Sequence, residues 1–188
     1  MNLRREVSRA LLARGYTVGE RNHLLRIDEN RSWVVDTGPL DSKRNDIAPF
    51  AGIRFDSVET LLTDLWELPA DDSSASIGAN VGYILGMGYK TFIPPTSVEQ
   101  VLGVIDAALE KLRTYMTIET FGQFWSATGV YDPAWRYRDI ISKFMTGRSG
   151  EIEAAFEAAR KEFCEFDDEM CEQFRLFERN LRTRIQQP

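Results

Sequence analysis

The chain has 188 residues, 43% of them hydrophobic and 11% aromatic, which is enough apolar side chain to bury a core and excludes an intrinsically disordered protein. Its formal net charge of −6 disfavours long-range attraction to nucleic acid or to an anionic membrane. No window approaches the roughly 18 apolar residues of a membrane span, and the first residues lack the apolar core of a signal peptide. We therefore expect a soluble, cytoplasmic protein with no membrane partner.

The first half of the chain is predicted to contain one helix followed by short strands. Apolar residues at helical spacing predict an amphipathic helix over 2–14, which Gly15 ends. Short apolar or alternating segments, bounded by turn residues, then predict strands within 16–27 and at 32–37, 47–55 and 77–85.

The glycine-rich segment 77–92 is expected to lie at the centre of the sheet. Strand alternation places Ile77 on an apolar face and Gly78, Gly82 and Gly86 on the opposite face. A face with so few side chains lets another element of the fold come close. A turn at 86–88 is predicted to return residues 89–92 as the partner strand of a hairpin.

The remaining segments predict helices. Two of them, at 57–68 and 97–116, are expected to pack against the sheet, and the chain from Ile118 onward reads as further helices. The last two are expected to form an antiparallel pair joined near 165–167. We therefore predict an α+β fold with a mostly antiparallel sheet of four to five strands. A sheet domain over 1–116 and a helical region over 117–188, docked on it, are expected to form one structural domain.

The two cysteines are expected to be reduced. Cys164 and Cys171 are seven residues apart in one predicted helical segment, which separates them by roughly 10 Å, too far for a disulfide within a helix. A zinc site is not expected, because His23 is the single histidine and no Cys-x-x-Cys occurs. We predict no metal and no cofactor.

Negative charge is concentrated late in the chain. Nine acidic residues and two basic ones lie between Glu151 and Glu172, a local charge of −7 against −6 for the whole chain. One interpretation is the solvated outer face of a helical hairpin. The other is a surface that docks a basic protein partner through complementary charge. The residues expected to bind that partner are Glu162, Glu165, Asp167, Asp168, Glu169 and Glu172.

Two alternative functions rest on other residues. A metal-dependent hydrolase or nuclease would use clustered carboxylates, either in the late acidic segment or near the predicted strand ends, where Asp28, Glu29, Asp36 and Asp41 lie with Lys43 nearby. His23 has no serine or cysteine partner that the sequence identifies. A single-strand nucleic-acid binder would use Trp125, Trp135 and Arg138. We identify no catalytic residues, and the chain is expected to be a binding protein rather than an enzyme.

The order of these elements resembles a known group of proteins. The resemblance is carried by Arg14-Gly15-Tyr16 and by the segments 50–54, 77–83 and 147–155, whose sequences are FAGIR, IGANVGY and GRSGEIEAA. They are similar to an uncharacterised bacterial domain family found in polymorphic-toxin and contact-dependent inhibition loci, where small acidic proteins serve as immunity factors. The resemblance implies a protein-binding role. Together with the acidic segment, it leads us to expect an immunity protein that neutralises a basic toxin domain.

Overall fold

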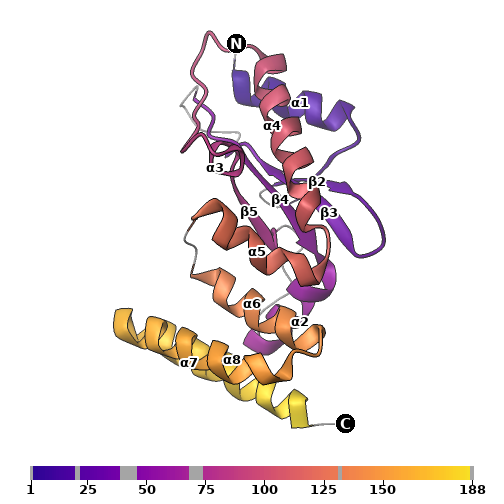
Figure 1. Cartoon of the computed structure of the whole chain (residues 1–188). Helices are drawn as coiled ribbons and strands as arrows, with labels where there is room; N and C mark the ends of the chain where they lie inside the picture. The colour runs from indigo at the N-terminus through magenta and orange to yellow at the C-terminus, as the bar shows by residue number, and fades with distance from the viewer. Residues whose placement is uncertain (1, 20–21, 39–45, 68–73, 131–132, 187–188) are drawn as a thin grey trace. The chain divides into compact units, whose positions relative to one another are not determined.

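The strands of the chain form one antiparallel sheet in the order of the sequence. The computed structural model describes residues 2–19, 22–38, 46–67, 74–130 and 133–186 (Figure 1). This meander confirms the predicted α+β class and the antiparallel sheet. The strands are β1 (Thr17–Val18), β2 (His23–Arg26), β3 (Arg31–Asp36), β4 (Phe50–Phe55) and β5 (Ile77–Asn80).

The helices divide between two compact units. The sheet unit is Met1–Asp56 with Asp72–Tyr131, and the helical unit is Ser57–Asp71 with Asp132–Pro188. These bounds differ from the expected division after residue 116, because α5 joins the sheet unit and α2 joins the C-terminal helices. The helices are α1 (Leu3–Ala13), α2 (Asp56–Trp66), α3 (Val81–Leu85), α4 (Val98–Leu112), α5 (Ile118–Thr128), α6 (Ala134–Met145), α7 (Ser149–Phe166) and α8 (Asp168–Gln186), with a 3₁₀ turn η1 at Arg113–Tyr115.

Aromatic contacts explain why these two helices lie outside their predicted groups. In the sheet unit, the ring of Phe121 on α5 packs 5.9 Å from that of Phe55 at the end of β4. In the helical unit, the ring of Trp66 on α2 lies 4.7 Å from that of Tyr137 on α6, edge to face. Such contacts join residues far apart in sequence, which periodicity does not predict.

One face of the sheet is covered by α1 and α4 (Figure 1). The apolar stripe predicted for α4 is buried as expected, because its members recur every three or four residues and so share one side of the helix. Its buried members are Val101, Leu102, Ile105, Ala108, Leu109 and Leu112, whereas Val98 and Met116, at the two ends of the predicted stripe, are half-buried.

The glycine-rich segment turns out to be a strand followed by a helix, so the predicted hairpin is wrong. The side-chain oxygen of Asn80 accepts hydrogen bonds from the backbone N–H of Gly82 and of Lys90, at 3.0 and 2.7 Å. This cap ends β5 and starts α3. The expected close approach is real: a Cβ on Gly82 would lie 2.0 Å from the carbonyl oxygen of Gly88.

The C-terminal helices α7 and α8 form the predicted antiparallel pair. They pack through phenylalanines with no exposed surface, and the ring of Phe163 lies 5.3 Å from that of Phe174. Among the described residues, no helix combines the length and the apolar character that crossing a membrane requires.

The cysteine prediction is wrong. Cys164 and Cys171 form a disulfide, with their Cα atoms 4.5 Å apart. The prediction failed because it placed both residues in one continuous helix. Asp167 is extended and separates α7 from α8, so the chain reverses between the two cysteines.

Candidate functional site

Four exposed carboxylates lie at the end of the hairpin where α7 meets α8. We call them the acidic tip: Glu165 on α7 and Asp168, Glu169 and Glu172 on α8. Within the part of the chain that the structure describes, no basic side chain pairs with any of the four. Opposite charge from outside would therefore meet these carboxylates without first displacing an internal partner.

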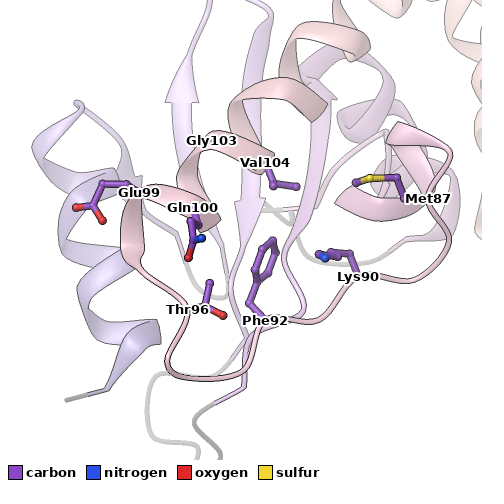
Figure 2. A pocket seen from close by; sticks show the side chains of 8 residues that line it. All are labelled: Met87, Lys90, Phe92, Thr96, Glu99, Gln100, Gly103 and Val104. Atoms are coloured by element: carbon purple, nitrogen blue, oxygen red, sulfur yellow. The ribbon is translucent and has the colours of Figure 1, made fainter.

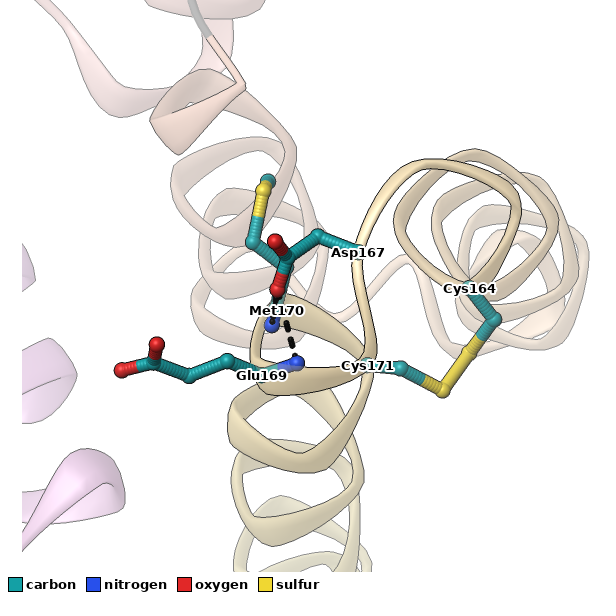
Figure 3. Close-up of a disulfide and its surroundings, with 5 residues drawn as sticks. All are labelled: Cys164, Asp167, Glu169, Met170 and Cys171. Carbon is teal, nitrogen blue, oxygen red and sulfur yellow. Dashed lines mark hydrogen bonds between the residues drawn. A yellow bond between two sulfur atoms is a disulfide. The ribbon is translucent and has the colours of Figure 1, made fainter.

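The turn beneath the acidic tip is held at several points. The side-chain oxygen of Asp167 accepts hydrogen bonds from the backbone N–H of Glu169 and Met170, at 2.7 and 3.1 Å, and so caps α8. The Cys164–Cys171 disulfide joins the two helices beside this cap, while the Glu169 side chain points away from it (Figure 3).

Ion pairs continue along the hairpin away from the tip. Arg160 on α7 pairs with Glu178 on α8 at 2.6 Å, and Arg182 pairs with both Glu178 and Glu153. The hydrogen bond from Arg182 holds the pKa of Glu153 below its ordinary value. These acids are therefore engaged within the hairpin, in contrast to the acidic tip.

Two of the residues predicted to bind a partner have structural contacts instead. The carboxylate of Glu162 accepts a hydrogen bond from Arg136 at 2.7 Å, and only 14% of its side chain is exposed. Asp167 is exposed but holds the helix cap. Of the six predicted residues, four lie at the hairpin end with exposed carboxylates that pair with no described basic residue.

The carboxylates considered for a metal site are dispersed or engaged. Asp28 pairs with Arg31, while Asp36 accepts a hydrogen bond from the backbone N–H of Gly38. Asp41 and Lys43 lie outside the described residues. Among the residues that the structure does describe, no group of three or more potential ligands could hold a metal ion.

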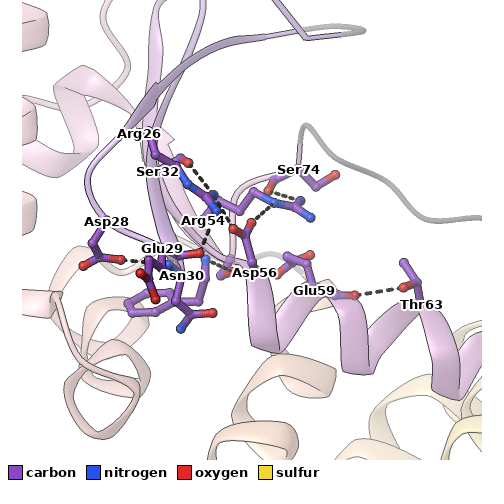
Figure 4. A network of polar contacts seen from close by, with 12 residues as sticks. Arg26, Asp28, Glu29, Asn30, Ser32, Arg54, Asp56, Glu59, Thr63 and Ser74 are labelled. Carbon is purple, nitrogen blue, oxygen red and sulfur yellow. Dashed lines mark hydrogen bonds and ion pairs between the residues drawn. The ribbon is translucent and has the colours of Figure 1, made fainter. Parts of the chain in front are cut away.

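Polar residues near the end of β4 form a network around Asp56 rather than a metal site (Figure 4). Asp56, the first residue of α2, accepts hydrogen bonds from both Arg26 and Arg54. Arg54 also donates to the carbonyl oxygen of Ser74 at 3.0 Å. These contacts join strand ends to a helix start, where a negative charge is favourable.

The side chains proposed for stacking single-stranded bases are largely buried. Trp125 is 7% exposed and Arg138 is 8% exposed. The Arg138 guanidinium donates two hydrogen bonds to the carboxylate of Glu59 on α2. Trp135 is partly exposed, with the guanidinium of Arg136 over its ring at 4.1 Å. A base would therefore meet one of the three side chains.

His23 has a serine partner that the sequence did not reveal. Its Nε2 lies 2.6 Å from the hydroxyl of Ser8, which is on α1, fifteen residues earlier. A serine–histidine pair supports nucleophilic catalysis only where a substrate can reach the hydroxyl. Ser8 and His23 are 5% and 4% exposed, so the pair holds α1 against the sheet rather than offering a reactive group.

We predict that this buried histidine makes the fold sensitive to mild acid. Burial lowers the pKa of His23, an effect partly offset by the backbone of Val35 and the charge of Asp36. As pH falls below about 6.5, His23 in the unfolded chain takes up a proton before His23 in the folded chain does. The free energy of unfolding therefore falls by at most about 1.4 kcal/mol per pH unit. Thermal unfolding measured from pH 7.5 to 5.5 should show this loss, and His23→Gln should remove the pH dependence. An unchanged slope in the variant would show that other groups cause it.

A surface hollow of about 580 Å³ lies in the sheet unit, beside the start of α4 (Figure 2). It was not predicted, because its walls come from a loop and from one side of a helix. The residues that line it are Met87, Lys90, Phe92, Thr96, Glu99, Gln100, Gly103 and Val104.

Comparison of the chain with protein-family models, with curated proteins and with solved structures finds no match. Functional inference for this chain therefore depends on the chemistry of its own surfaces.

Proposed function

We propose that the chain is a non-catalytic binding protein that docks a basic surface of a protein partner against the acidic tip. The observation that carries this proposal is the set of four exposed carboxylates, which no basic side chain of the described residues pairs with, at the end of a disulfide-linked hairpin. Complementary charge at the rim of an interface accelerates association and sets register. Such pairs add little affinity each, about 0–1 kcal/mol. The acidic tip would thus raise the association rate, while other contacts would supply most of the affinity.

A toxin-neutralising immunity protein is the specific form of this proposal. In that form, the acidic tip would cover lysines or arginines that a toxin domain otherwise uses to engage nucleic acid. Such inhibition requires only a surface that covers the toxin domain, and no catalytic residue. The support is the resemblance in element order together with the placement of the acidic tip.

The proposal also places the protein in the cytoplasm, and the disulfide bears on that location. A reducing cytoplasm keeps most cysteines as thiols, whereas an oxidising compartment closes such a bond. The hairpin has further support, from the buried phenylalanines and from the pairing of Arg182 with Glu153 and Glu178. The acidic tip therefore does not depend on the disulfide alone for its place.

Charge reversal tests the proposal. The quadruple variant Glu165→Lys, Asp168→Lys, Glu169→Lys and Glu172→Lys is expected to slow association with a basic partner by at least about tenfold at low salt. The difference should shrink as salt rises, because exposed charges are screened. Association of each variant with a basic protein domain is followed by stopped-flow fluorescence.

A matched pair of variants separates local charge from net charge. Asp168→Lys with Glu172→Lys changes the net charge as much as Glu29→Lys with Glu157→Lys, which are exposed acids outside the acidic tip. The first pair should slow association several-fold more than the second. Equal rates for both pairs, or a quadruple variant that binds like the natural chain at low salt, would refute the acidic-tip mechanism.

A further inference from the structure

Half of the large apolar side chains that are exposed among the described residues lie in one short segment. Tyr83, Met87, Tyr89 and Ile93 are 40%, 57%, 63% and 66% exposed. They are four of the eight large hydrophobic residues found exposed among the described residues, and all lie within 83–93. Contiguous exposed apolar patches on a protein surface often mark sites of interaction with a partner.

This segment borders the hollow of about 580 Å³ beside α4. Phe92, which is 6% exposed, forms an apolar wall, and Met87 and Val104 line the hollow as well. Figure 2 shows these side chains around a common space. The volume is within the usual range of ligand pockets, which hold large apolar groups.

A glycine in the middle of α4 keeps the hollow open. Gly103 lies within a fifteen-residue helix, where glycine is less favourable than alanine. A Cβ at this position would have nothing within 4 Å, so no neighbour in the fold requires a glycine there. A larger side chain at this position would extend from the wall of the hollow that Gly103 lines. The surface at Gly103 therefore leaves room for a group from outside the chain.

The hollow also holds a positive charge without a counter-ion. The Lys90 ammonium lies 5.3 Å from the centre of the Phe92 ring, and among the described residues no carboxylate pairs with it. Glu99 on the rim is ionised, because hydrogen bonds from its own backbone N–H and the Ser97 hydroxyl hold its pKa below the ordinary value, and it forms no ion pair with Lys90. An incoming carboxylate would find the ammonium available.

We propose that this hollow docks a segment of a protein partner that inserts one large apolar side chain against Phe92, over Gly103, and presents a carboxylate to Lys90. A second copy of the chain fits less well. The four exposed apolar residues offer on the order of 500 Å², below the roughly 800 Å² that each subunit contributes to a stable interface. Charge complementarity at Lys90 selects an acidic occupant, opposite to the basic partner proposed for the acidic tip.

The smallest probe with this chemistry is N-acetyl-L-phenylalanine, which joins one aromatic side chain to one carboxylate. Titrating it into the ¹⁵N-labelled full chain should shift the amide signals of Lys90, Phe92 and Val104. The expected Kd is on the order of 1 mM, the usual affinity of a fragment this size. The corresponding amide, which lacks the charge, should bind about fivefold more weakly.

Two variants test the walls of the hollow. Gly103→Leu should fill it and weaken probe binding more than about tenfold, while raising the melting temperature by about 2–4 °C through helix propensity. Lys90→Met keeps the apolar stem and should reduce binding to the level of the amide probe. The control is Gly150→Leu in α7, another helical glycine with nothing near its Cβ, which should leave binding unchanged.

Several outcomes would overturn the proposal. They are the absence of shifts around the hollow, equal binding of acid and amide, and full binding by a folded Gly103→Leu variant. Concentration-dependent dimerisation that Gly103→Leu abolishes would instead identify a second copy as the occupant and refute a foreign segment. None of these results bears on the acidic tip, which lies in the other unit.

Discussion

Replacing Arg138 with methionine is expected to destabilise the helical unit by about 3–5 kcal/mol, the usual cost of breaking a buried ion pair by removing one partner. The guanidinium donates to both carboxylate oxygens of Glu59, at 2.9 and 2.7 Å. The two side chains are 10% and 4% exposed, so the variant leaves a charge out of contact with water. Urea unfolding, followed by tryptophan fluorescence, would measure the loss.

Two controls separate the ion pair from simple packing. Removing both charges, as Glu59→Leu with Arg138→Met, should recover most of the stability, because no unpaired charge remains. Arg184→Met breaks an exposed pair with Asp64 in the same unit and should cost less than about 1 kcal/mol. A single Arg138→Met variant as stable as the natural chain would show that Glu59 finds another partner or becomes protonated.

Replacing Gly82 with alanine is expected to destabilise the sheet unit by about 3 kcal/mol, at the upper end of the usual cost of overpacking. The added Cβ would lie 2.0 Å from the carbonyl oxygen of Gly88 and 2.7 Å from the Cβ of Lys90. One of these atoms belongs to the backbone, so the loop itself must move. Because that loop carries Lys90, the variant should also lose binding of N-acetyl-L-phenylalanine.

The control for this variant is Gly103→Ala, which adds the same methyl group where nothing lies within 4 Å. It should stabilise the chain by up to about 1 kcal/mol. Urea unfolding and the probe titration together check both results. If Gly82→Ala kept the stability and the binding of the natural chain, the close approach of the loop to α3 would be wrong.

The two proposed surfaces differ in chemistry and therefore in what they contribute to binding. The acidic tip is charged and exposed, and it should act mainly on the association rate. The hollow combines apolar walls with one ammonium, and it should act mainly on the lifetime of a complex. Salt would separate the two contributions, since screening weakens the first far more than the second.

Local pattern predicted most of the elements of this fold. The stripe of α4 and the antiparallel pairing of α7 with α8 follow from apolar spacing, which depends only on neighbouring residues. Strand propensity likewise anticipated β3 within one residue at each end, and it anticipated the end of β4, which begins three residues later than predicted. Four of the six acidic residues named from the sequence are exposed at the hairpin end, because charge concentrated near a helix turn is a local property too; their role in binding stays a prediction.

Tertiary structure decided the features that depend on contacts between residues distant in the chain. The Asn80 side chain accepts a hydrogen bond from the backbone N–H of Lys90, and a helix begins where a hairpin strand was predicted. The break at Asp167 lets Cys164 and Cys171 form a disulfide. Glu162 is half-buried and paired with Arg136, and the hollow forms where a loop and one side of α4 line a common space. These differences share one physical reason. Periodicity in the sequence indicates which face of a helix or strand a residue lies on, whereas the packing of the whole chain decides which atoms contact it.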